Sequence, residues 1–202
     1  METLGKIQTN LKIGTEPLTI SGKPLPFTLL DFWRWNGSDI ISNATRGRLA
    51  EFIVATATNV DLNSPRDEWQ SYDLETPEKI RIEIKSSSYI QSWYQKCLSK
   101  ISFSIRPARE WNNETGIQSN LQQRHAHVYV MCLLKHCDQS TINPLDMSQW
   151  EFYVLSTKEI GCYPRSQSSI TLKSLQNMTK SVDYSTLCQE IDYKYQINNS
   201  KD

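Results

Sequence analysis

The residue types best suited to chemistry lie in and just before one short segment of alternating apolar and charged residues. Residues 80–85 read Ile-Arg-Ile-Glu-Ile-Lys, and Asp73 precedes Glu83 by ten positions. Successive side chains of a strand point to opposite faces, so Glu83 and Lys85 share a polar face while the isoleucines share the other. Asp73 reaches the same face when the intervening residues turn back as a hairpin.

Two carboxylates and a lysine on one polar face are suited to holding a divalent metal ion with a water beside it. Mg²⁺ prefers oxygen ligands and keeps several waters, so Asp73 and Glu83, with the backbone carbonyl of Ile84 as a third oxygen, suffice as protein ligands. The metal would lower the pKa of a bound water and stabilise charge that develops on a phosphodiester. Lys85 would lie beside that water, where it orients the nucleophile, assists its deprotonation or offsets phosphate charge. Residue type and spacing leave these three roles open.

A helix is expected before this strand. Asn43 is suited to cap a helix that runs to about Asn59. Glu51 lies on this helix, where it can add a carboxylate or hold a metal-bound water. The apolar positions of the helix recur near helical spacing and predict its buried stripe: Leu49, Phe52, Ile53, Ala57 and Val60.

Strands and further helices are expected on both sides of the acid-lysine segment. Residues 69–74 and 79–86 are predicted to pair as strands through a turn at 75–78, which contains Pro77. The remaining pattern predicts a polar-aromatic helix over 89–100, a strand over 101–105, a mobile loop over 109–124, strands over 127–134 and 151–155, a helix over 172–178 capped by Ser169, and another from a cap at Asp183 to about Ile191.

The chain of 202 residues is long enough for one domain with a substantial core. The order of its elements predicts the α/β class, with a central mixed sheet flanked by helices and one strand edge open to substrate. We expect a core at about 43–160, an N-terminal extension at 1–42 and a C-terminal helical segment at 165–195. In the extension, the aromatic-rich residues 27–35 are expected to form a short helix that packs in the core.

The overall charge does not indicate a polyanion partner, because 22 basic and 22 acidic residues cancel. The stretch 96–135 carries six basic and two acidic residues, an excess that by itself fits an ordinary solvated surface. No apolar run has the length of a membrane span or the character of a signal peptide, so we expect a cytoplasmic protein with no membrane partner. The five cysteines are scattered without a C-x-x-C pair, which argues against a zinc knuckle and a disulfide framework.

The arrangement of Glu51 on an early helix, Asp73 on a strand and Glu83-Ile84-Lys85 on the next resembles the PD-(D/E)xK nuclease superfamily over about residues 43–135. The resemblance implies a restriction-endonuclease-like core and hydrolysis of DNA phosphodiesters with Mg²⁺, for which Mn²⁺ can substitute. Defence against foreign DNA and repair are the settings that it implies. By the same resemblance, Asp73 and Glu83 are the metal-binding acids, Lys85 is the catalytic lysine and Glu51 is an auxiliary acid.

The chain departs from the superfamily pattern at one position, because Tyr72 replaces the proline that gives the superfamily its name. Gln91, six residues after the lysine, corresponds to a glutamine with which some members hold substrate or the lysine. Basic residues beside Trp93 and Tyr94, and those on the helix of Glu51, can contact phosphates. The full set of expected substrate-binding residues is Ser86, Tyr89, Gln91, Arg46, Arg48, Lys96 and Lys100.

Other interpretations of the same residues stay open at this level. A D-x9-E-x-K pattern also arises by chance on a half-exposed strand whose polar face carries salt bridges. The adjoining strands, the apolar opposite face and the flanking helices favour the nuclease. The alternatives are a catalytically weak or inactive DNA-binding module of the same fold and an unrelated α/β interaction protein. Cutting both strands of a duplex often needs two sites, so a homodimer is a further expectation.

Overall fold

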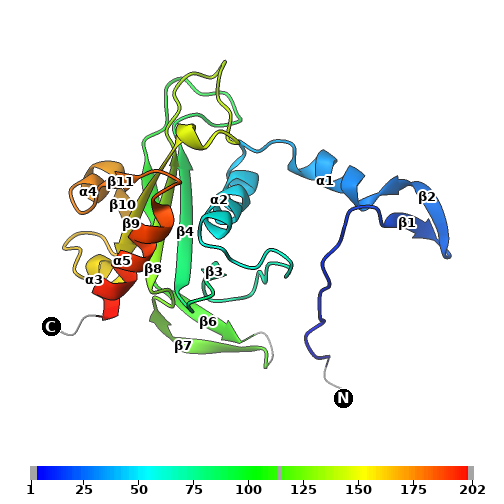
Figure 1. Ribbon diagram of the computed structural model, residues 1–202, viewed down its shortest axis with the longest axis horizontal. Coiled ribbons are helices and arrows are strands. Elements are labelled where there is room, and N and C mark those ends of the chain that lie inside the picture. The colour runs from blue at the N-terminus through cyan, green and yellow to red at the C-terminus, as the bar shows by residue number, and fades with distance from the viewer. Residues whose placement is uncertain (1–3, 113–114, 200–202) are drawn as a thin grey trace.

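A five-stranded sheet forms the centre of the computed structural model, which describes residues 4–112 and 115–199 (Figure 1). The strand order is β11-β9-β8-β4-β3, with β4 and β8 parallel and the other neighbours antiparallel. The sheet is therefore mixed, as the sequence predicts. Its strands are β3 (Leu74–Glu75), β4 (Arg81–Ser88), β8 (Val128–Leu134), β9 (Trp150–Ser156) and β11 (Ser181–Val182).

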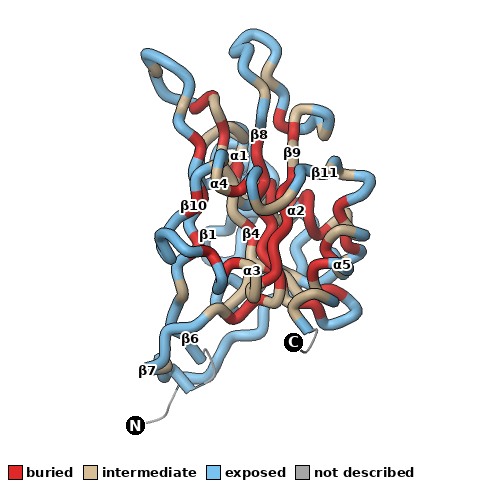
Figure 2. The backbone as a smooth tube through the Cα atoms, turned by 90° about the vertical axis from the view of Figure 1, so that its left-hand side faces the viewer, coloured by how far each residue is buried: buried red, intermediate tan, exposed pale blue. Residues whose placement is uncertain are grey.

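Strands β8 and β9 form the most deeply buried part of the molecule, which Figure 2 shows as the red centre of the tube. All seven residues of β8 are buried, and β9 is buried at every position except Glu151. A strand covered on both faces reads as a continuous apolar run, and the sequence of β8 is such a run. The strands predicted over 127–134 and 151–155 are thereby confirmed.

Helices α2 (Asn43–Ala57) and α5 (Leu187–Asn199) cover one face of the sheet. Ile82 and Ile84 of β4 pack there in one cluster with Ile53 of α2 and Ile191 of α5. The other face carries a second cluster, in which Met131 of β8 is fully buried. This second face is covered by β5 (Ser102–Ser104), β10 (Ser169–Thr171), α3 (Thr157–Gly161) and α4 (Leu172–Gln176).

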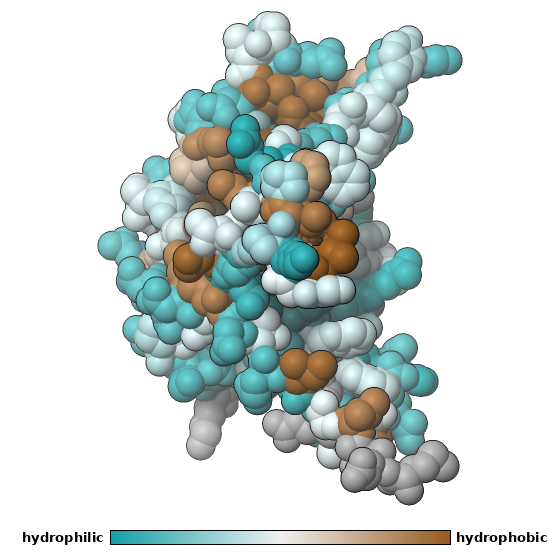
Figure 3. Space-filling view, turned by 90° about the vertical axis from the view of Figure 1, so that its right-hand side faces the viewer, coloured by the Kyte–Doolittle hydropathy of each residue, from teal (hydrophilic) through white to brown (hydrophobic). Residues whose placement is uncertain are grey.

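The N-terminal arm consists of β1 (Pro17–Ile20), β2 (Lys23–Thr28) and α1 (Leu29–Gly37), and it extends away from the sheet (Figure 1). The expectation that its aromatic residues pack in the core is wrong, because α1 has no buried residue and Trp35 is 83% exposed. The helix is closed locally instead, by a capping box between Thr28 and Asp31. Figure 3, viewed from the side of the arm, shows several hydrophobic patches on this face of the molecule.

The region 109–124, expected to be a mobile loop, is largely a hairpin of β6 (Ala108–Asn112) and β7 (Ile117–Gln123). Its backbone pairing needs no buried face, so the polar sequence gave no alternating signal. Residues 113–114 at its tip lie outside the described residues.

The polar-aromatic helix expected over 89–100 does not form, although the structure describes this whole segment. Glutamine side chains bond the backbone there in place of helical bonds. Oε1 of Gln95 accepts from the Gln91 N–H at 2.7 Å, and Nε2 of Gln95 donates to the Tyr89 carbonyl at 3.2 Å. Such hydrogen bonds from side chains to the backbone compete with regular secondary structure.

The strand before this segment is longer than expected. Ser86, expected at the end of its strand, lies within β4, which continues to Ser88.

Several predicted boundaries shift in the structure. The strand expected over 69–74 is reduced to β3, and α2 has Ser42 rather than Asn43 as its N-cap. Phe52, expected in the buried stripe of α2, is 53% exposed, while Ala50 takes a fully buried position. Near the C-terminus, α4 is capped by Thr171 rather than Ser169, and α5 extends to Asn199.

The described chain also includes one 3-10 helix at Met147–Gln149, and all five cysteines are free thiols. In the part of the chain that the structure describes, no helix combines the length and the apolar character needed to cross a membrane.

The buried sheet and the exposed N-terminal arm are expected to differ in how strongly truncation of a large apolar side chain lowers stability. Ile82 is fully buried at the centre of the sheet, so Ile82→Ala is expected to lower the free energy of unfolding by about 2–5 kcal/mol. Trp35→Ala, in the exposed arm, is expected to change it by less than about 0.5 kcal/mol. Urea unfolding followed by circular dichroism measures both. A comparable loss in Trp35→Ala would mean that the arm packs on the core.

Candidate active site

The site forms where the outermost strand of the sheet is short. β3 pairs only Leu74 and Glu75 with β4, so the edge of β4 beyond this pairing faces the residues that precede β3. Asp73 lies there. Its N–H donates to the Ile82 carbonyl at 3.0 Å, and its Oδ2 accepts from the N–H of Ile84 at 2.7 Å. The backbone groups of alternate residues point to the same side of a strand, so the Ile84 carbonyl faces this edge as well.

Lys85 joins the two carboxylates that the sequence pattern singled out. Its ammonium donates a hydrogen bond to Oε1 of Glu83, and its Nζ lies 3.9 Å from Oδ2 of Asp73. All three side chains are only partly exposed. The structure therefore brings Asp73, Glu83 and Lys85 together, with one cation between two carboxylates.

Glu51 reaches the same group of charges from α2, through an arginine that the sequence analysis missed. Arg66 donates a hydrogen bond to Oε2 of Glu51, and its Nη2 lies 4.0 Å from Oδ1 of Asp73. Arg66 comes from the irregular loop between α2 and β3, where no periodicity or motif marks a position. No sequence signal could have identified it.

Two of these carboxyl groups are unfavourable places for negative charge. Burial raises the pKa of Glu83, and the nearby charge of Asp73 raises it further, while Lys85 acts in the opposite direction. Burial also raises the pKa of Glu51, opposed mainly by its hydrogen bond from Arg66. A cation added between these groups would relieve both burial and mutual repulsion.

The residues present fit a magnesium ion that keeps several of its waters. Among the described residues, no three His, Cys, Asp or Glu side chains are placed to share a metal ion. Mg²⁺ needs only one or two protein carboxylates, however. Asp73 and Glu83 supply two, the Ile84 carbonyl faces the same edge, and the Lys85 ammonium already lies between the two carboxylates.

The expected substrate-binding residues divide into two groups. Arg46, Ser86, Gln91 and Lys100 line one cavity of about 470 Å³, together with Lys85. In this group, Nε of Arg46 donates to Oγ of Ser86 at 3.0 Å.

The other three expected residues lie apart from this cavity. Arg48 forms an exposed ion pair with Glu68 at 3.4 Å. Tyr89 packs against the cluster on the second face of the sheet, and Lys96 lies on the exposed surface of the loop after β4.

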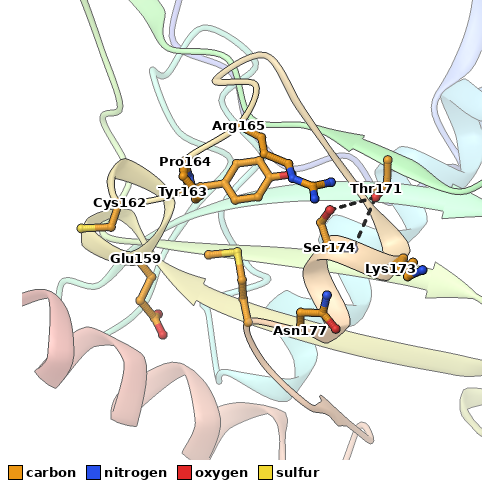
Figure 4. Close-up of a pocket in the computed structure, with 10 residues that line it drawn as sticks. Glu159, Cys162, Tyr163, Pro164, Arg165, Thr171, Lys173, Ser174 and Asn177 are labelled. Atoms are coloured by element: carbon orange, nitrogen blue, oxygen red, sulfur yellow. Dashed lines mark hydrogen bonds between the residues drawn. The ribbon is translucent and has the colours of Figure 1, made fainter.

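A different cavity of about 580 Å³ lies between α3 and α4 (Figure 4). Figure 4 shows Arg165 near Thr171 and Ser174, with Glu159 across the cavity. Glu159 is the one carboxylate among its described lining residues, and its oxygens already accept from Ser156 and from Lys194. This cavity therefore offers a metal ion a single carboxylate, which is already engaged within the protein.

Comparison with known proteins identifies a family for most of the chain. The family model described as Bacteriophage T4 endonuclease IV matches residues 30–183. This range includes α2 and the central strands, and hence every residue of the candidate site. No curated protein matches the chain.

The raised pKa of Glu83 predicts how stability depends on pH. A carboxyl group with a raised pKa binds its proton more tightly in the folded than in the unfolded protein. Such a group lowers the free energy of unfolding as the pH rises above 4.5, the ordinary pKa of a glutamate. Glu83→Gln removes this cost, so its Tm at pH 8 without metal is expected to exceed that of the wild type, by about 2–4 °C for each kcal/mol relieved. The difference should shrink as pH falls toward 4.5.

Differential scanning calorimetry between pH 4.5 and 8 measures this difference. Glu110→Gln, at an exposed position of β6, is the matched control and should leave Tm almost unchanged. A lower Tm for Glu83→Gln at pH 8 would mean that the contact with Lys85 outweighs the cost of burial.

Proposed function

This chain belongs to the bacteriophage T4 endonuclease IV family, and from this we propose that it is a magnesium-dependent DNA endonuclease whose active site is the Asp73–Glu83–Lys85 group. Membership of an endonuclease family implies a phosphodiester hydrolase that acts on DNA. The observation that supports the site most directly is the position of the Lys85 ammonium between the carboxylates of Asp73 and Glu83.

The proposal includes the restriction-endonuclease-like core and the PD-(D/E)xK assignment. Three features support it. A helix that carries Glu51 precedes the sheet, the first acid lies beside the edge strand, and the second acid and the lysine lie on its partner strand. The parallel pairing of β4 with β8 gives the mixed sheet that the assignment requires.

Asp73, Glu83 and the Ile84 carbonyl are the groups that would hold Mg²⁺, or Mn²⁺ in its place. The ion would lower the pKa of a bound water and stabilise negative charge on the phosphodiester. Lys85 holds its positive charge next to both acids. It can orient the attacking water, assist its deprotonation through its positive charge or offset the charge of the phosphate. The hydrogen bond from the Ile84 N–H fixes the Asp73 carboxylate in place.

Glu51 is proposed as an auxiliary acid rather than a direct metal ligand. Its carboxylate is held by Arg66, which also lies near Asp73. Arg66 thus keeps the two acids at a fixed separation and reduces the repulsion between them. From there Glu51 can hold a metal-bound water.

The proposed biological setting is defence against foreign DNA or DNA repair, and the proposed assembly is a homodimer. Defence against foreign DNA and repair rest on analogy with the PD-(D/E)xK superfamily. A homodimer would bring two such sites to the two strands of a duplex.

Substitution of Asp73 or Lys85 is expected to cause a large loss of metal-dependent DNA cutting. Lys85→Ala and Asp73→Asn should each lower the cleavage rate at least about a hundredfold, the loss typical of removing one group that stabilises transition-state charge. The assay uses plasmid and linear DNA with Mg²⁺, Mn²⁺ or EDTA, and circular dichroism confirms folding.

Lys173→Ala, in the cavity of Figure 4, is the matched control and should cut at the wild-type rate. Binding of DNA without cutting by the wild type would favour the inactive binding module instead. Full activity of both site variants, or activity in EDTA, would remove this group of residues as the active site.

A further inference from the structure

Arg46 is a buried cation that forms no ion pair with any residue in the described ranges. It is 3% exposed, and its hydrogen bonds go to neutral acceptors. Nε donates to Oγ of Ser86 at 3.0 Å, and Nη1 donates to the Ile41 carbonyl at 2.8 Å and to Oε1 of Gln91 at 3.2 Å. Nη2 donates to Oδ1 of Asn43 at 2.7 Å.

A buried charge is costly unless an opposite charge accompanies it, and arginine cannot escape by losing its proton. Two other arginines nearby are paired, Arg48 with Glu68 and Arg66 with Glu51. Among the described residues, no carboxylate forms an ion pair with Arg46. Its charge is therefore balanced only by neutral dipoles, which leaves a place for an anion.

The cavity beside Arg46 has the lining that an anion needs. Its volume is about 470 Å³, and Lys85 and Lys100 are among its lining residues. Its other polar lining residues are serines, Asn43 and Gln91, and no acid is present among the lining residues that the structure describes. The guanidinium of Arg46, the ammonium of Lys100, several hydroxyl groups and the lack of a carboxylate among these residues favour a phosphate over any neutral or cationic ligand.

The guanidinium group of Arg46 is also held in position by its hydrogen bonds, which leave one of its N–H donors unused. Its four recorded bonds use four of the five N–H donors of an arginine, which leaves one hydrogen on Nη2. Gln91 is itself held, since its Nε2 donates to the Ser88 carbonyl at 2.8 Å and to Oγ of Ser99 at 3.2 Å. A fixed, water-shielded charge binds an anion with little further loss of entropy.

We propose that this cavity binds a phosphate of the DNA backbone next to the phosphate that is hydrolysed, with Arg46 as its fixed positive charge and Lys100 at its exposed rim. The inference rests on the proposed function, since Lys85 connects the cavity to the acids Asp73 and Glu83. It gives Arg46 a role in binding substrate rather than only in joining α2 to β4.

The test removes the charge of single phosphates in the DNA. A fluorescent oligonucleotide that the wild type cuts, or any that it binds tightly, is prepared with one neutral methylphosphonate at each position in turn. Anisotropy in EDTA measures the Kd. The wild type is expected to lose about tenfold or more in affinity at one position, the scale of one lost charge-assisted contact. In Arg46→Met, binding should be weaker for the normal DNA and insensitive to that position.

A second variant protects the test against misfolding of Arg46→Met. Lys100→Gln changes an exposed side chain, so it should fold normally, bind more weakly and show a slope of log K against log salt reduced by about one. Arg165→Met and Lys173→Gln, in the cavity of Figure 4, are the matched controls and should keep the wild-type pattern.

Each outcome bears on one proposal separately. Equal sensitivity to that position in folded Arg46→Met and the wild type, an unchanged salt slope in Lys100→Gln, or wild-type DNA binding that no single methylphosphonate weakens would overturn the phosphate site. Absence of DNA binding by the wild type would overturn it as well. A wild type that shows the positional loss and yet never cuts with Mg²⁺ would support the phosphate site and remove the enzymatic function.

Discussion

The hydrogen bond from the Ile84 N–H to the Asp73 carboxylate is the contact on which the site depends. β3 is only two residues long, so β4 presents backbone groups at an edge that no strand in the described part of the chain covers. An edge N–H needs a partner, and a carboxylate is a strong one. By accepting this bond, Asp73 completes the edge of the sheet and is held within 3.9 Å of the Lys85 ammonium. The same contact thus satisfies the backbone and assembles the group of charges.

The site separates charges of opposite sign on the two sides of Lys85. On one side, Asp73, Glu83 and Glu51 lie close enough that burial and repulsion raise the pKa of the two glutamates. On the other side, Arg46 lines a cavity without acids. Neither arrangement favours folding, because like charges repel and buried charges are costly. The proposed metal ion at the acids and the proposed phosphate in the cavity would each offset this cost. Sites of this kind exchange stability for binding.

The parts of the fold that burial determines could be predicted from the sequence. The strands β8 and β9 are continuous apolar runs, and the alternation in β4 assigned Glu83 and Lys85 to one face. The parts determined by single side chains could not. Gln91 and Gln95 replace an expected helix by bonds to the backbone, which no periodicity reveals. The exposed hairpin of β6 and β7 and the exposed helix α1 likewise have no buried face to leave a pattern.

The three arginines around α2 show why residue type alone could not assign the phosphate contacts. Arg46 and Arg48 are two positions apart, and the sequence predicts a phosphate contact for both. Two positions on a helix turn the side chains about 200° apart, so one points into the protein and the other into solvent. Arg48 finds Glu68 at the surface, and Arg66, from a loop, finds Glu51. Arg46 is enclosed by neutral acceptors before any acid can reach it. This difference in surroundings is why we propose an external phosphate for Arg46 and not for Arg48 or Arg66.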